Sequence, residues 1–206
     1  LKEFDRDLGW KCVETAKEDF RFAKQRFLEK GMEKPIMWEH TLNSGKSQYY
    51  AAAVWAAASI CANEPSEEFE KEAKKFGAKL LACQETETDG VPMKGFFYRD
   101  ESHKVIVHFT HQGRDHSFEM LCRAFPEAEE KPAWEKSLRL YGDYLKGLYA
   151  MATPYGMIPA GIHHMSETED KETFELLHLL VEFEKEKENY AKQLKNGIVL
   201  GNDYYV

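Results

Sequence analysis

Apolar residues recur along most of the chain at steps of three and four, the spacing that places side chains on one face of an α-helix. This single-stripe pattern predicts amphipathic helices over residues 8–29, over a segment capped by Ser66 and reaching Leu80, and over residues 132–151. The stripe of the first segment consists of Val13, Ala16, Phe20, Ala23 and Phe27.

Two further segments are apolar on most sides. Residues 44–62 contain Tyr-Tyr-Ala-Ala-Ala-Val-Trp-Ala-Ala-Ala at positions 49–58. Residues 112–125 contain Phe118, Met120, Leu121, Cys122, Ala124 and Phe125. A helix that is hydrophobic all round is expected to be buried all round. The chain therefore alternates outer, amphipathic helices with inner, buried ones. Long connections lead from outer to inner helices, and short ones lead back.

The long connections interrupt the helical period. Gly90 and Pro92 break the chain within residues 85–111, where two β-rich runs, Gly95 to Tyr98 and Val105 to Phe109, predict a β-hairpin insertion over about residues 94–110. Residues 153–170 are again rich in Pro and Gly. A last helix is expected over residues 171–195, with its charged second half facing solvent.

Antiparallel helical hairpins in two layers, with every long loop on one rim, describe an all-α fold of the α/α toroid class. At roughly 60 to 70 residues per hairpin, residues 1–206 would supply about three hairpins, half of a six-hairpin barrel. We therefore expect one domain, or a segment of one.

The composition and the missing motifs exclude several classes of function. The chain has 28 Lys+Arg against 36 Asp+Glu, a formal net charge of −8, which argues against nucleic acid as a partner. No apolar run is long enough to suggest a membrane span, and no signal peptide opens the given chain. No GxSxG, P-loop or GxGxxG pattern occurs, and we expect no cofactor. The four cysteines fall in helical patterns and are expected to be buried and free, with a disulfide in an oxidising compartment as the alternative.

The predicted rim collects the polar and aromatic residues. Six of the eight histidines lie in the three long connections, where a rigid scaffold commonly presents binding groups. The sequence therefore predicts a concave binding site at this rim. Its candidate substrate-binding residues are Trp38, His40, Tyr98, Arg99, His111, Arg114, Tyr155 and His163.

Two motifs carry the candidate chemistry. Arg114 begins an inner helix, where it could hold a sugar or a carboxylate, although a structural ion pair would explain it equally well. Asp100 and Glu101 are weak candidates for acid–base catalysis, with turn formation by Asp100 and Ser102 as the alternative. His108 and His111 lack the carboxylate spacing that would support a metal site, so no metal is predicted.

Several segments together resemble the six-hairpin glycosidase superfamily, and within it bacterial proteins related to glycoside hydrolase family 9. They begin at Gly45 (Gly-Lys-Ser-Gln-Tyr-Tyr-Ala-Ala-Ala-Val-Trp), Gly95 (Gly-Phe-Phe-Tyr-Arg-Asp), His111 (His-Gln-Gly-Arg-Asp-His), Thr153 (Thr-Pro-Tyr-Gly-Met-Ile-Pro-Ala-Gly) and Val199 (Val-Leu-Gly-Asn-Asp-Tyr-Tyr).

This resemblance implies a central segment of an (α/α)6 toroid, a periplasmic or extracellular location, an oligosaccharide or polysaccharide substrate, and hydrolysis of a glycosidic bond. The family's inverting carboxylate pair includes an Asp-Ala-Gly-Asp motif that this chain does not contain. Two alternatives stay open. One is a sugar epimerase or isomerase that uses two of His103, His111 and His163, and the other is a non-catalytic helical binding module.

Overall fold

The computed structural model describes residues 3–31, 45–87, 93–107, 113–151, 162–164 and 198–200. Its helices are α1 (Arg6–Lys30), α3 (Gly45–Asn63), α4 (Glu67–Leu81), α5 (Arg114–Ala124) and α6 (Lys131–Met151). The described part of the chain is mainly helical, as predicted, and each of these five helices agrees with its sequence-based range to within about two residues at either end. The helix predicted over residues 171–195 lies outside the described residues.

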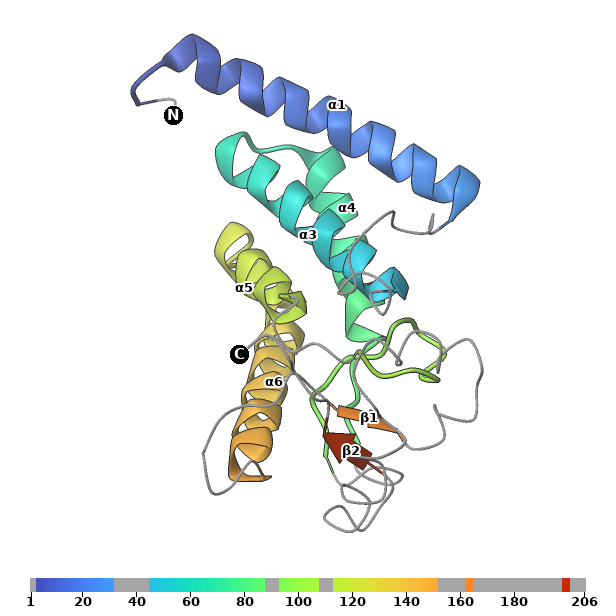
Figure 1. Cartoon of the computed structure of the whole chain (residues 1–206). Helices are drawn as coiled ribbons and strands as arrows, with labels where there is room; N and C mark the ends of the chain where they lie inside the picture. Colours follow the sequence, from blue (N-terminus) through green and yellow to red (C-terminus); the bar gives the residue numbers. More distant parts are fainter. Residues whose placement is uncertain are drawn as a thin grey trace.

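Helix α3 lies at the centre of the helical arrangement (Figure 1). It packs against α1, α4 and α5, and α5 in turn packs against α4 and α6. Val54, Ala57 and Ala58 of α3 are fully buried, as are Phe118 and Leu121 of α5. Small alanine side chains let the neighbouring helices approach closely, and α3 and α5 each pack against three of the other described helices.

The prediction that α3 is buried on every side is wrong. Trp55 is 44% exposed, and Ala52 and Ala62 are also exposed. These positions follow one another at steps of three and seven and therefore share one face. Alanine favours a helix whether it is buried or exposed, so its abundance identifies the helix without identifying the covered face.

Residues 93–107 form a loop that is anchored by its backbone. The Arg99 N–H donates to Val105 O and the Val107 N–H donates to Phe97 O, both at 2.8 Å, around an isolated antiparallel bridge between Tyr98 and Ile106. These bonds join the two runs predicted as hairpin arms. Within residues 93–107 the pairing extends no further than this bridge.

A buried polar network fastens the same loop to α6. Gln84 Nε2 donates to Gly95 O at 2.9 Å and to Ser137 O at 3.1 Å, and Ser137 Oγ donates to Gln84 Oε1 at 2.6 Å. Because buried amides are costly unless hydrogen-bonded, this network fixes where the loop leaves α4 and crosses α6.

Two short strands, β1 (Ile162–His164) and β2 (Ile198–Leu200), pair in antiparallel register, with His163 opposite Val199. The sequence did not predict this pairing, because three-residue strands 34 positions apart give no local periodic signal.

The cysteines divide by burial. Cys83 is buried and Cys61 and Cys122 are half-buried, but Cys12 is exposed on α1, contrary to the expectation of burial. All four are free thiols. None of the helices in the described ranges is both long and apolar enough to cross a bilayer.

Candidate functional site

The first turn of α3 lies directly against the loop of residues 98–103. The Ser47 N–H donates to Arg99 O at 2.8 Å, and the Tyr50 hydroxyl donates to Glu101 Oε1 at 2.8 Å. Gly45 permits this approach, because it has φ +61° and a Cβ there would lie 2.6 Å from the Arg99 Cβ. The predicted residues Tyr98, Arg99, Asp100 and Glu101 are therefore held at the start of an inner helix.

Arg114 reaches the same place from the first residue of α5. It is only 3% exposed, and its Nε donates to Ser47 Oγ at 2.9 Å. Burial lowers the pKa of its guanidinium to about 9, so the group is still a cation at neutral pH. Arg114 thus bonds to Ser47, the residue whose backbone N–H bonds to Arg99 O in the 98–103 loop.

Arg99 brings a second cation to this site. The positive charge of Arg99 contributes to lowering the pKa of Arg114, so the two guanidinium groups interact. The Arg99 Nε is buried and has no hydrogen-bond partner in the described part of the chain, and the same is true of the buried Gln48 Oε1. Arg99 Nε is therefore a buried donor that the described residues leave unused.

Asp100 forms a turn with Ser102, which is the alternative to catalysis that the sequence predicts for it. Its Oδ1 accepts a 2.9 Å hydrogen bond from the Ser102 N–H. Partial burial works to raise its pKa, but hydrogen bonds from Ser102 and the charges of Lys46 and Arg99 together hold the pKa below its usual value. Asp100 is therefore ionised at neutral pH and suited to accept hydrogen bonds, whereas a general acid requires a raised pKa.

Tyr98 and His103 anchor the loop. Their rings stack with centroids 4.3 Å apart, the Tyr98 hydroxyl donates to Glu85 Oε2 at 2.7 Å, and His103 Nε2 lies 2.7 Å from Ala82 O. His103 also adopts a positive φ of 57°, which is uncommon for a residue other than glycine. In His103, Nε2 is therefore occupied by Ala82 O, and one face of the ring is covered by Tyr98.

Other predicted residues are not placed at this site. Trp38, His40, His111 and Tyr155 lie outside the described residues. His163 belongs to β1 by its backbone, and the structure does not describe its side chain. His116, one position after Asp115 in α5, is exposed and lies beside Trp55 with ring centroids 6.1 Å apart.

Two cavities have different characters. The first lies beside Arg114, among rings of Phe96, Phe97 and Tyr141, and its volume of about 10 Å³ is the size of one water molecule. The second, between α1 and α3, has about 560 Å³. Gly9, Cys12, Val13, Ala16, Ala56, Ser59 and Ile60 account for most of its lining. It is therefore a mainly apolar groove at the other end of α3.

The sequence missed the contribution of the α3 start. Ser47 and Tyr50 supply the hydroxyl and phenol groups that bond to Arg114 and to Glu101 of the 98–103 loop. The one available signal was the polar Gly-Lys-Ser-Gln stretch that opens an otherwise alanine-rich helix.

Among the residues that the structure describes, no three His, Cys, Asp or Glu side chains cluster closely enough to hold a metal ion. The sequence matches no known protein-family description, and no curated protein or solved structure is significantly similar to it.

Proposed function

We propose that this protein binds a carbohydrate at a rim site made of Ser47, Tyr98, Arg99, Asp100, Glu101 and Arg114. The observation that carries the proposal is the meeting of guanidinium, carboxylate and hydroxyl groups from α3, α5 and one connecting loop. Each sugar hydroxyl both donates and accepts hydrogen bonds. Guanidinium groups supply planar donors and carboxylates supply planar acceptors, so the two together on a rigid scaffold can bind sugar hydroxyls.

The placement of the connections supports a toroid as the scaffold. Residues 31–44 lead into α3 and residues 82–113 lead into α5, and these two long stretches both precede an inner helix. The starts of α3 and α5 are joined by the bond between Arg114 and Ser47, so both connections reach the same end of the helix pair. This is the arrangement expected of a half-toroid whose long loops share one rim.

The contacts of the two described carboxylates suit them to hold a ligand. Asp100 is ionised and serves as a turn acceptor, and Glu101 accepts a hydrogen bond from Tyr50 while its side chain reaches solvent. Glu101 is thus the better candidate for an acid–base group if the site hydrolyses a glycosidic bond. A non-catalytic carbohydrate-binding module is the second candidate, because both carboxylates already have structural partners.

Calorimetric titration with a panel of neutral and acidic oligosaccharides tests the proposal. We expect saturable binding that falls at least about tenfold in Arg99→Gln, which loses the charge and the forked donor set. Arg123→Gln is the matched control, because Arg123 is an exposed arginine on the far end of α5, paired with Glu119. Binding to no glycan, or equal loss in both variants, would overturn the proposal.

Chromatography of the same incubations separates the two candidates. Release of shorter sugars that stops in Glu101→Gln while binding is retained would support hydrolysis. Unchanged oligosaccharides bound by the wild-type protein would support the binding module.

A further inference from the structure

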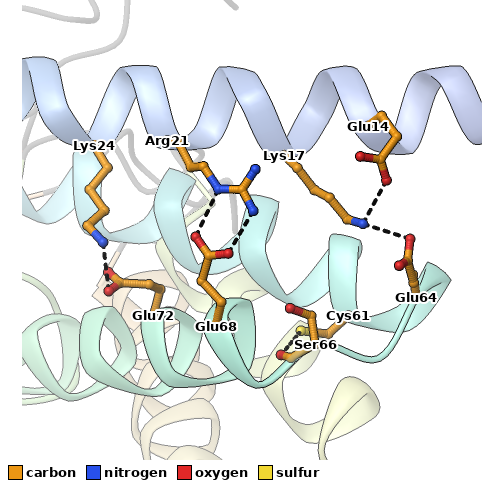
Figure 2. Close-up of polar contacts among 9 residues, drawn as sticks. All are labelled: Glu14, Lys17, Arg21, Lys24, Cys61, Glu64, Ser66, Glu68 and Glu72. Carbon is orange, nitrogen blue, oxygen red and sulfur yellow. Dashed lines mark hydrogen bonds and ion pairs between the residues drawn. The ribbon is translucent and has the colours of Figure 1, made fainter.

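Helix α1 is attached to the α3–α4 hairpin by a series of ion pairs (Figure 2). Lys17 Nζ lies 2.7 Å from Glu64 Oε2, and Lys24 Nζ lies 2.8 Å from Glu72 Oε1. Between them, Arg21 donates two bonds to Glu68, from Nε at 2.9 Å and from Nη2 at 2.7 Å. We call these three cross-helix pairs the ionic ladder.

The positions of the charged residues allow only one alignment of α1 along the α3–α4 hairpin. Its cations stand at positions 17, 21 and 24 of α1, steps of four and three that share one helix face. Its acids stand at 64, 68 and 72, so the partners appear in the same order along both segments. A shift of α1 by one turn would break a cross-helix pair at an end of the ladder. Glu72 is only 8% exposed, so the loss of Lys24 would leave its buried carboxylate with Lys75, whose Nζ lies 3.9 Å away.

The apolar seam beneath the ladder is small. Over its 25 residues α1 buries only Gly9, Val13, Lys17 and Phe20, whereas Phe22 and Leu28 are 67% and 68% exposed. Helix α4, which is shorter, buries Phe69, Ala73, Phe76 and Leu80. The attachment of α1 therefore combines a short apolar seam with the three ion pairs of the ladder.

Aromatic rings connect α1 to the rim site. Phe27, next to the ladder, stacks on Tyr49 with centroids 3.7 Å apart and planes 11° apart. Phe27 and Tyr49 each also contact the ring of Tyr50 edge-on, at 6.3 Å and 6.2 Å. The Tyr50 hydroxyl holds Glu101, so a continuous chain of contacts runs from α1 to the site.

We propose that α1 is a latch, closed by the ionic ladder, that positions Glu101 for the rim site through Phe27 and Tyr50. The part that concerns ligand binding rests on the proposed function, whereas the latch itself does not. Opening the latch removes the Phe27 ring from Tyr49 and Tyr50, and it thereby loosens the first turn of α3 and the loop bonded to it. Tyr50 and Phe27 are positioning residues, and Glu101 is the site residue that they position.

Hydrogen exchange of the full chain tests the latch without a ligand. At about 0.1 M NaCl, where charges interact over roughly 10 Å, Arg21→Glu should raise exchange in α1 about tenfold. Exchange should also rise in residues 45–50 and 98–103, but not in α6. The charge-swapped double variant Arg21→Glu/Glu68→Arg should return all three segments to within about threefold of wild type. Raising NaCl to about 1 M should reduce the wild-type protection of α1.

Lys11→Glu is the matched control, because it makes the same charge change on α1 at a residue with no ion pair in the described part of the chain. It should leave exchange unchanged. Equal exchange of α1 in Arg21→Glu and wild type would overturn the latch, and so would a uniform rise that includes α6. Faster exchange in α1 alone would overturn the connection to Glu101. If these changes occur but no glycan binds, only the proposed function fails.

Discussion

The Nε of Arg114 donates a 2.9 Å hydrogen bond to the hydroxyl of Ser47, 67 positions earlier in the sequence. This bond ties the first turn of α5 to the first turn of α3. It also carries a buried cation to the place where the 98–103 loop meets α3. The geometry of the proposed site therefore depends on the starts of two inner helices being held together.

Ser47→Ala removes this acceptor from a buried guanidinium. We expect the free energy of unfolding to fall by about 1–3 kcal/mol, since a charged donor loses a buried partner. Chemical denaturation measures the change. Ser59→Ala, on the same helix but half-buried, should change stability by no more than about 0.5 kcal/mol. Equal effects of the two substitutions would show that the Ser47 bond contributes little.

Gly95 sits where no side chain fits. It has φ +99°, and a Cβ there would collide with the Leu140 carbonyl oxygen of α6. Gly95→Ala should therefore destabilise the protein by more than about 2 kcal/mol, from backbone strain together with steric overlap. Thermal or denaturant unfolding reports the loss.

Gly142→Ala provides the opposite case in α6 itself. A Cβ at Gly142 meets nothing within 4 Å, and alanine favours a helix interior over glycine by up to about 1 kcal/mol. We expect this variant to be as stable as wild type or more stable. A destabilised Gly142→Ala would contradict the packing described for α6.

Periodicity was sufficient to predict five helices, because stripes such as Val13, Phe20 and Phe27 are local patterns that a helix makes directly visible. It could not predict which face of α3 is covered, because alanine occupies both buried and exposed positions of this helix and the sequence pattern does not distinguish them. Asp100 and Ser102 are two residues apart, so their turn was foreseeable. The pairing of Arg114 with Ser47 was not, because no local pattern specifies contacts across 67 positions.

The thiols should differ in reactivity. Burial raises the pKa of Cys83 to about 12, whereas Cys12 is exposed. Because the thiolate is the reactive form, a disulfide reagent at pH 8 should modify Cys12 rapidly in the native protein and Cys83 only on unfolding. Peptide mass spectrometry after timed quenching identifies each site. Rapid native modification of Cys83 would contradict its burial.

Acid should weaken the loop through Asp100. Its pKa is lowered in the folded protein, so its stabilising contribution is fully present above the ordinary aspartate pKa and is lost as pH falls through the folded value. Between about pH 5 and pH 3, wild type should lose more stability than Asp100→Asn, which keeps an acceptor for the Ser102 N–H but does not titrate. We expect a difference below about 1 kcal/mol, because the carboxylate is only partly buried and solvent screens its interactions.

Parallel pH titrations of unfolding in wild type and Asp100→Asn measure this difference. Identical pH dependence of the two proteins would show that Asp100 is not held by the charges of Lys46 and Arg99.

Chemical-shift mapping of the backbone amides during a glycan titration tests the rim site most directly. We expect the largest shift changes in residues 45–50, 98–103 and 113–117, where α3, the loop and α5 meet. Changes confined to the apolar groove of residues 9–16 and 56–63, or no changes with any glycan, would contradict the rim site.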